Sequence, residues 1–111
     1  MAYYMFQGRF SAETLKRILA KPEDRSKAAA KIAKACGGRL HRYYISLGEY
    51  DFVSILELPD DKAAASCAMD VTASGVATHM ATTRLLTPAE AMGSMAKAQS
   101  AAPSLPLPKG A

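Results

Sequence analysis

A turn at residues 47–51 constrains the fold of this chain more than any other feature. The turn, Leu-Gly-Glu-Tyr-Asp, lies between two strongly apolar stretches, residues 40–47 and 52–58. Gly48 allows the positive φ that a tight hairpin needs, and both flanking stretches are rich in β-branched and aromatic residues. The sequence therefore predicts one antiparallel hairpin near the middle of the chain.

Size and composition limit the architecture to one folded domain. The chain has 111 residues, of which 50% are hydrophobic and 22% are charged, a balance typical of a folded protein. No apolar run approaches the length of about 18 residues that a membrane-spanning helix needs. The opening residues 1–6 lack the basic region of a signal peptide. We therefore expect a cytoplasmic location.

The part of the chain before the hairpin predicts one strand and two helical segments. Residues 3–10 are expected to form the strand, and Ser11 suits the N-cap of the helix that follows. Pro22 suits the first turn of a second helical segment. That segment is expected to run through an alanine-rich stretch to Cys36 and to stop at Gly37-Gly38.

The part after the hairpin predicts a helix, a strand and a last helix. Pro59-Asp60-Asp61 is a helix start, with Asp60 or Asp61 as the cap, and Gly75 closes that helix. Residues 76–86 are expected to form the fourth strand. Thr87-Pro88-Ala89-Glu90 is a capping box with proline at the first helical position, so the last helix begins there.

A proline-rich tail is expected to follow the domain. We divide the chain into a domain of residues 1–99, ending where the last helix fades near Gln99, and a tail of residues 100–111. The prolines of the segment 103–109 cannot continue a helix, which predicts an extended, mobile tail.

The order of these elements predicts the fold class. It is β-α-β-β-α-β followed by a C-terminal helix, the pattern of ferredoxin-like α+β domains. Right-handed crossovers place both main helices on one face of a sheet with strand order 4-1-3-2. The third strand, residues 52–58, is apolar on both of its faces, and the helices cover only one. We therefore expect a homodimer joined through the sheet faces, on which higher assemblies can be built.

The residues around the hairpin resemble the GYD-domain family. Gly48, Tyr50 and Asp51 match the glycine, tyrosine and aspartate after which that family is named, and the resemblance covers roughly residues 3–97. It is carried by the segments 43–53 and 57–64. The resemblance implies a dimeric α/β barrel, in which two ferredoxin-like sheets pack face to face with the helices outside. The wider superfamily includes cofactor-independent monooxygenases, lactone isomerases, haem-binding enzymes and stress-related proteins, so the fold constrains the chemistry little.

Asp51 and His79 are the candidate catalytic residues. Asp51, at the start of the third strand, could act as a general base at a pocket mouth, or it could accept backbone N–H bonds and hold the hairpin. His79 lies within the fourth strand among threonines, where it could bind a ligand, act as an acid or base, or be a hydrogen-bonded structural residue.

Three tyrosines are the candidate ligand-binding residues. Tyr43 and Tyr44 point to opposite faces of the second strand, so one of them faces the helices. Tyr50 could hydrogen-bond a ligand or pack as a wall. A pocket, if present, should lie between sheet and helices, with Asp51, His79 and one of Tyr43 or Tyr44 supplying its polar groups.

No metal or cofactor is expected. His41 and His79 fall on opposite edge strands, about 14 Å apart, so they cannot share a metal within one chain. Cys36 and Cys67 lack metal-ligand spacing and are interpreted as small buried apolar residues. The chain also has no glycine-rich phosphate loop and no haem-type motif.

The sequence favours a small homodimeric protein that binds a small, partly apolar molecule. The alternative is a cofactor-independent monooxygenase or isomerase that acts on a small aromatic or lactone substrate. RNA-recognition motifs share the same element order, but the third strand lacks their Lys/Arg-Gly-aromatic signature. The net charge of +4 is attributed to a solvated helix face that carries Lys27, Lys31 and Lys34. We therefore expect neither a nucleic-acid nor a membrane partner.

Overall fold

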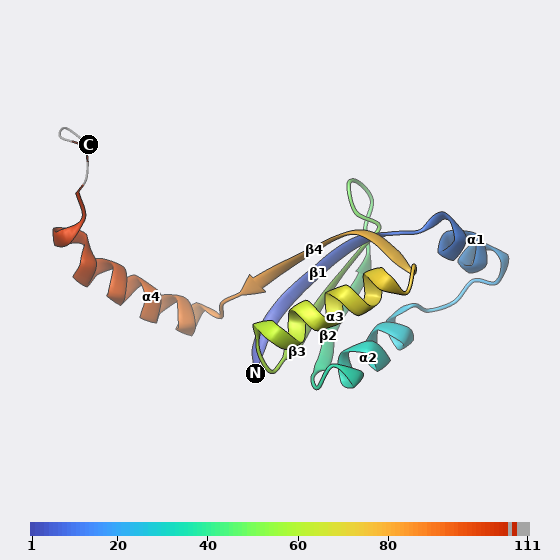
Figure 1. Ribbon diagram of the computed structural model, residues 1–111, viewed down its shortest axis with the longest axis horizontal. Helices are drawn as coiled ribbons and strands as arrows, with labels where there is room; N and C mark the ends of the chain where they lie inside the picture. Colours follow the sequence, from blue (N-terminus) through green and yellow to red (C-terminus); the bar gives the residue numbers. More distant parts are fainter. Residues whose placement is uncertain (107, 109–111) are drawn as a thin grey trace.

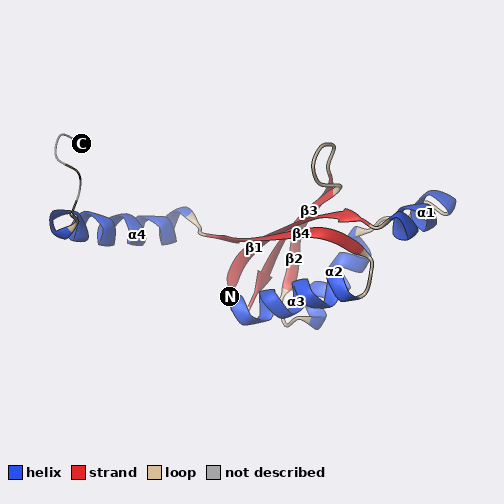
Figure 2. Ribbon diagram, turned by 45° about the horizontal axis from the view of Figure 1, so that its top comes forward, coloured by secondary structure: helices blue, strands red, loops and turns tan. Residues whose placement is uncertain are grey.

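The protein has the predicted ferredoxin-like α+β architecture. The computed structural model describes residues 1–106 and 108. The elements in chain order are β1 (Ala2–Phe10), α1 (Ala12–Ala20), α2 (Ser26–Ala35), β2 (Arg39–Ile45), β3 (Phe52–Leu58), α3 (Asp61–Ala73), β4 (Ala77–Leu85), α4 (Pro88–Ala101) and a short 3-10 helix, η1 (Ala102–Ser104). The strands form one antiparallel sheet in the order β2-β3-β1-β4, which confirms the predicted order. Helices α2 and α3 cover the same face of that sheet (Figures 1 and 2).

The hydrophobic core lies between the sheet and helices α2 and α3. Every second residue of β3 is buried, and β1 alternates in the same way over most of its length. The helices contribute small buried side chains: Ala33 from α2, and Ala64 and Cys67 from α3. Small side chains let the helix backbones approach the sheet closely, so the larger residues of the strands fill most of the core.

The opposite face of the sheet, which we call the outer face, carries half-exposed apolar side chains. Its central residues are Met5 of β1 and Val53 and Ile55 of β3, and Figure 2 shows the helices α2 and α3 on the other side. Near one edge, hydrogen bonds with His41 and Arg39 hold the pKa of Glu57 below its ordinary value. The predicted two-faced sheet is therefore present, and within the described residues the chain itself covers only one face.

Helices α1 and α4 extend away from the sheet (Figures 1 and 2). Neither helix has a buried residue, and Leu19, Met92 and Met95 are all exposed. The radius of gyration is 18.0 Å, whereas a compact chain of this length would have about 13 Å. Both helices begin at capping residues, Ser11 and Thr87, so local sequence favours the start of each helix.

The second helical segment begins later than the sequence predicted. We expected Pro22 in the first turn of this helix, but α2 starts at Ser26. The Asp24 carboxylate accepts hydrogen bonds from the backbone N–H of Ser26 at 3.0 Å and from its hydroxyl at 2.6 Å. Because this local turn precedes the helix, Pro22 lies outside it and Arg25 becomes the N-cap residue.

The C-terminal helix also differs from the prediction. Helix α4 continues past Gln99 to Ala101, and residues 102–104 form a 3-10 turn rather than an extended tail. Pro103 is compatible with this turn because it lies in the first turn of a helix, where its missing N–H is not needed. The prediction for residues 107 and 109–111 lies outside the described residues. Over residues 1–106 and 108, the helices are too short or too polar to cross a membrane.

Candidate functional site

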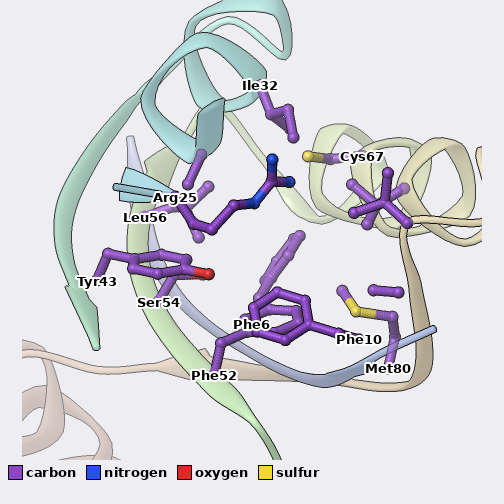
Figure 3. Close-up of a pocket in the computed structure, with 14 residues that line it drawn as sticks. Phe6, Phe10, Arg25, Ile32, Tyr43, Phe52, Ser54, Leu56, Cys67 and Met80 are labelled. Atoms are coloured by element: carbon purple, nitrogen blue, oxygen red, sulfur yellow. The ribbon is translucent and has the colours of Figure 1, made fainter. Parts of the chain in front are cut away.

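A small apolar pocket lies between the sheet and helices α2 and α3, where the sequence predicted a pocket. All four strands and both helices contribute to its walls (Figure 3). Its volume is about 50 Å³, whereas pockets that enclose drug-sized ligands are about 300–1,000 Å³. The pocket as it stands is therefore suited to a molecule of a few heavy atoms.

Aromatic rings form one wall of the pocket. The ring of Phe52 lies 5.3 Å from that of Phe10 and 6.0 Å from that of Tyr43, nearly parallel to the latter. Gly8 makes this arrangement possible. A Cβ atom at this position would lie 2.7 Å from the sulfur of Met80 and 2.8 Å from Cζ of Phe52. The glycine therefore provides the space in which two pocket residues pack against β1.

Three pocket residues carry polar groups: Arg25, Tyr43 and Ser54. Arg25 precedes α2, and its Nη1 donates a hydrogen bond to the Glu23 carboxylate at 2.8 Å. Its Nε is buried and has no hydrogen-bond partner among the described residues. Figure 3 shows the guanidinium pointing into the pocket, between the Tyr43 ring and the side chains of Ile32 and Cys67.

Burial controls the protonation of two other pocket groups. It raises the pKa of the Tyr43 phenol, although the positive charge of Arg25 opposes this increase. Burial also raises the pKa of the Cys67 thiol to about 12, and the Cys36 thiol next to it adds to the effect. Both groups therefore stay protonated at neutral pH, so Tyr43 can donate a hydrogen bond and Cys67 behaves as an apolar wall residue.

Of the three candidate tyrosines, the structure places only Tyr43 at the pocket. Tyr44, the next residue of β2, points to the outer face and is 58% exposed. Tyr50 lies in the hairpin turn, where its carbonyl oxygen accepts a hydrogen bond from the Ser46 hydroxyl at 2.7 Å. Side chains alternate along β2, so Tyr43 faces the pocket and Tyr44 faces away from it. Tyr50 does not reach the pocket because it lies in the hairpin loop.

Asp51 does not line the pocket, contrary to the predicted placement. Its carboxylate accepts a hydrogen bond from the backbone N–H of Phe10 at 2.9 Å, and its own N–H donates to the Gly8 carbonyl at 2.8 Å. Because β1 and β3 are antiparallel neighbours, the end of β1 lies beside the start of β3. These contacts support the structural interpretation of Asp51. Its carboxylate and N–H connect β3 to β1, and its carbonyl oxygen accepts a hydrogen bond from the Ser46 N–H at 2.9 Å, which closes the β2–β3 hairpin.

His79 also lies away from the pocket. It is exposed on β4, an edge strand, and its Nδ1 is 3.1 Å from the Thr78 hydroxyl. The pairing of β4 with β1 shifts by one residue at this point, and His79 has a positive φ of 52°. Such a β-bulge turns side chains away from the alternation that a regular strand would give. The structure therefore does not bring His79 and Asp51 together at the pocket.

The backbone at His79 leads to a prediction about stability. In a regular strand isoleucine stabilises the fold more than glycine does. At a positive φ the order is reversed, because this backbone conformation disfavours β-branched residues and suits glycine. We expect the free energy of unfolding of the His79→Gly protein, measured by urea denaturation, to be about 1 kcal/mol higher than that of the His79→Ile protein. The matched pair Thr82→Gly and Thr82→Ile, on the same strand, should show the opposite order. The same order at both positions would contradict the prediction.

Arg25 was not predicted as a pocket residue from the sequence. A usable signal was present, because Arg25, Ala29 and Ile32 have the i, i+4, i+7 spacing of one helix face. All three line the pocket. Arg25 stands at the start of this otherwise apolar face, and this position predicts a polar group directed into the protein.

Comparisons with known proteins identify a family and two similar solved structures. Residues 4–95 match the profile of the GYD domain. The comparison with curated proteins found no match. Among solved structures, the chain is similar to FFRP-DM1, with 16% identity, a TM-score of 0.49, and coverage of 78% of this chain and 100% of the other. It is also similar to the hypothetical protein PHS023 from Pyrococcus horikoshii, with 16% identity, a TM-score of 0.48, and coverage of 78% and 92%.

Proposed function

The chain belongs to the GYD domain family, and on this basis we propose that it is a homodimer that binds a small, partly apolar molecule in the pocket between sheet and helices. The observation that carries the binding proposal is the pocket itself. Its walls are mainly apolar and aromatic, and Arg25, Tyr43 and Ser54 supply a few polar groups. This combination of an apolar enclosure with few polar groups is typical of small-molecule sites.

The pocket volume limits the size of the ligand. One water-sized group occupies about 10–15 Å³ in this measure. The pocket of about 50 Å³ thus has room for about three to five such groups. A larger aromatic or lactone molecule would require the helices or the Phe10 and Phe52 rings to move.

The contacts support binding more than catalysis. A cofactor-independent monooxygenase or isomerase needs an acid or base within hydrogen-bond reach of its substrate. Asp51 and His79, the candidates for that role, do not line the pocket. Asp51 in addition uses its carboxylate for a backbone hydrogen bond. Binding without an acid–base step is therefore the function that this geometry supports best.

The outer face of the sheet supports the homodimer. Apolar side chains at its centre, among them Met5 and Ile55, are only half-buried in the single chain. Contiguous apolar surface of this kind commonly marks an interaction site, and a second copy presents a surface of matching character. The dimer would bury the outer face while it leaves the pocket on the opposite side of each sheet.

A cavity-filling variant tests the binding proposal. We expect titration with propan-1-ol, followed by ¹H–¹⁵N NMR, to give saturable shifts at residues near the pocket such as Ile32 and Ser54. Ala29→Leu should abolish these shifts because the longer side chain fills the pocket. Ala30→Leu places the same side chain on an exposed position of α2 and should leave them unchanged. Absence of saturable shifts in the wild-type protein, or equal shifts in both variants, would contradict ligand binding at this pocket.

A further inference from the structure

We infer that the ligand of this pocket is a short organic carboxylate, and that Arg25 binds its carboxylate group. This inference rests on the proposed function, because it names the chemical class of the molecule that enters the same pocket. It extends that proposal by assigning a charged group to the ligand and a binding role to one residue.

Arg25 is a half-buried cation whose hydrogen-bond donors are not all satisfied. The Arg25 side chain is 19% exposed, and its Nε is buried without a hydrogen-bond partner among the described residues. A buried donor without a partner is uncommon and costs free energy, all the more when it belongs to a charged group. A ligand with an acceptor at this position would remove that cost.

The guanidinium of Arg25 has one edge that is free to bind a ligand. Glu23, which is 53% exposed at its side chain, accepts the hydrogen bond of Nη1 from the solvent side. The Nε–H lies on another edge of the guanidinium, beside Nη2, and a guanidinium edge of this kind matches the two oxygens of a carboxylate. Figure 3 shows the guanidinium among the pocket residues rather than in solvent. The inner edge of Arg25 is therefore suited to a bidentate carboxylate.

The charge balance inside the pocket favours a ligand with one negative charge. Among the described residues, no aspartate or glutamate lines the pocket, so the protein supplies no inner anion to Arg25. The nearby Asp24 carboxylate is exposed and hydrogen-bonded to Ser26. Glu23 already balances part of the charge of Arg25, the cation among the described lining residues, so the single charge of a carboxylate suits this site better than the double charge of a phosphate monoester.

The remaining pocket surface selects the rest of the ligand. The Tyr43 hydroxyl points toward the interior (Figure 3), and it stays protonated because burial raises the pKa of this phenol. It can therefore donate to a carboxylate oxygen. Phe6, Ile32 and Met80 offer only apolar contacts, which suit an alkyl group. With space for about three to five water-sized groups, the pocket fits a molecule of the size of acetate or propionate.

The test compares two molecules of nearly equal shape that differ in charge. Propionate and propionamide are titrated separately into the wild-type protein at pH 7 and constant ionic strength, with ¹H–¹⁵N NMR as the readout. We expect the dissociation constant of propionate to be at least tenfold lower. Equal dissociation constants would overturn the carboxylate assignment and leave the proposed function intact, because a neutral molecule would then still enter the pocket. Absence of pocket shifts with propionate, propionamide and propan-1-ol alike would overturn both.

A variant pair tests the role of Arg25. Arg25→Gln should remove the preference for propionate over propionamide while binding of propionamide changes little. Arg17→Gln removes the same charge from an exposed position of α1 and should keep the preference. Retention of the full preference by Arg25→Gln would overturn the assignment to this residue. If Arg25→Gln does not fold, the comparison of the two molecules on the wild-type protein still decides the ligand class.

Discussion

Gly38→Ala is expected to lower the free energy of unfolding by more than about 3 kcal/mol, or to prevent folding. Gly38 lies between α2 and β2, directly against the backbone of β3. A Cβ atom at this position would overlap the carbonyl oxygen of Glu57 and lie 2.8 Å from its carbonyl carbon. Glu57 is paired with Tyr3 of β1 and with Arg39 of β2, so its backbone cannot move without disturbing both pairings.

Urea denaturation, with circular dichroism as the signal, measures this loss in the free energy of unfolding. Gly93→Ala is the matched control, because Gly93 lies within α4 and a Cβ atom there meets nothing within 4 Å beyond its chain neighbours and the nearby backbone of its own helix. We expect this control to be as stable as the wild-type protein or up to about 1 kcal/mol more stable, since alanine favours helix over glycine. A Gly38→Ala protein with wild-type stability would show that the connection between α2 and β2 differs from the one described.

Ile55→Lys is expected to convert the proposed homodimer into a monomer. Ile55 lies at the centre of the outer face, opposite Met5 of β1 and next to Arg42 of β2. In the dimer a lysine here would place a charge among buried apolar side chains, close to Arg42, which carries a large free-energy cost. We expect the dimer dissociation constant to rise by at least about 100-fold, which corresponds to roughly 2.7 kcal/mol. Because Ile55 is only half-buried in the single chain, the fold of the monomer should survive.

Size-exclusion chromatography with light scattering measures this change. Met69→Lys introduces the same charge on α3, at a residue that is 68% exposed and lies on the other side of the sheet, and should leave the dimer intact. A wild-type protein that remains monomeric at micromolar concentration would contradict the homodimer, and so would an Ile55→Lys protein that remains dimeric.

Local sequence determined the elements and their order. The Asp60 side chain accepts a hydrogen bond from the Ala63 N–H at 2.9 Å, as expected for the cap of α3, and Thr87 and Glu90 form the predicted capping box. Interactions of this kind join residues three positions apart, so a few neighbouring residues are enough to specify them. The predicted strand order followed from the element order and the right-handed crossover in the same way.

Tertiary structure decided which residues reach the pocket. Asp51 is held by the Phe10 backbone, and His79 is displaced by a bulge in β4. Both effects depend on how β1 pairs with its two neighbours, strands that are distant in sequence. Arg25 enters the pocket because α2 begins after the Asp24 turn and packs against the sheet. The sequence by itself thus determined the fold, since capping and side-chain alternation act over short distances. Only tertiary packing decided that Asp51 and His79 lie away from the pocket, because register and bulges arise where separate strands meet.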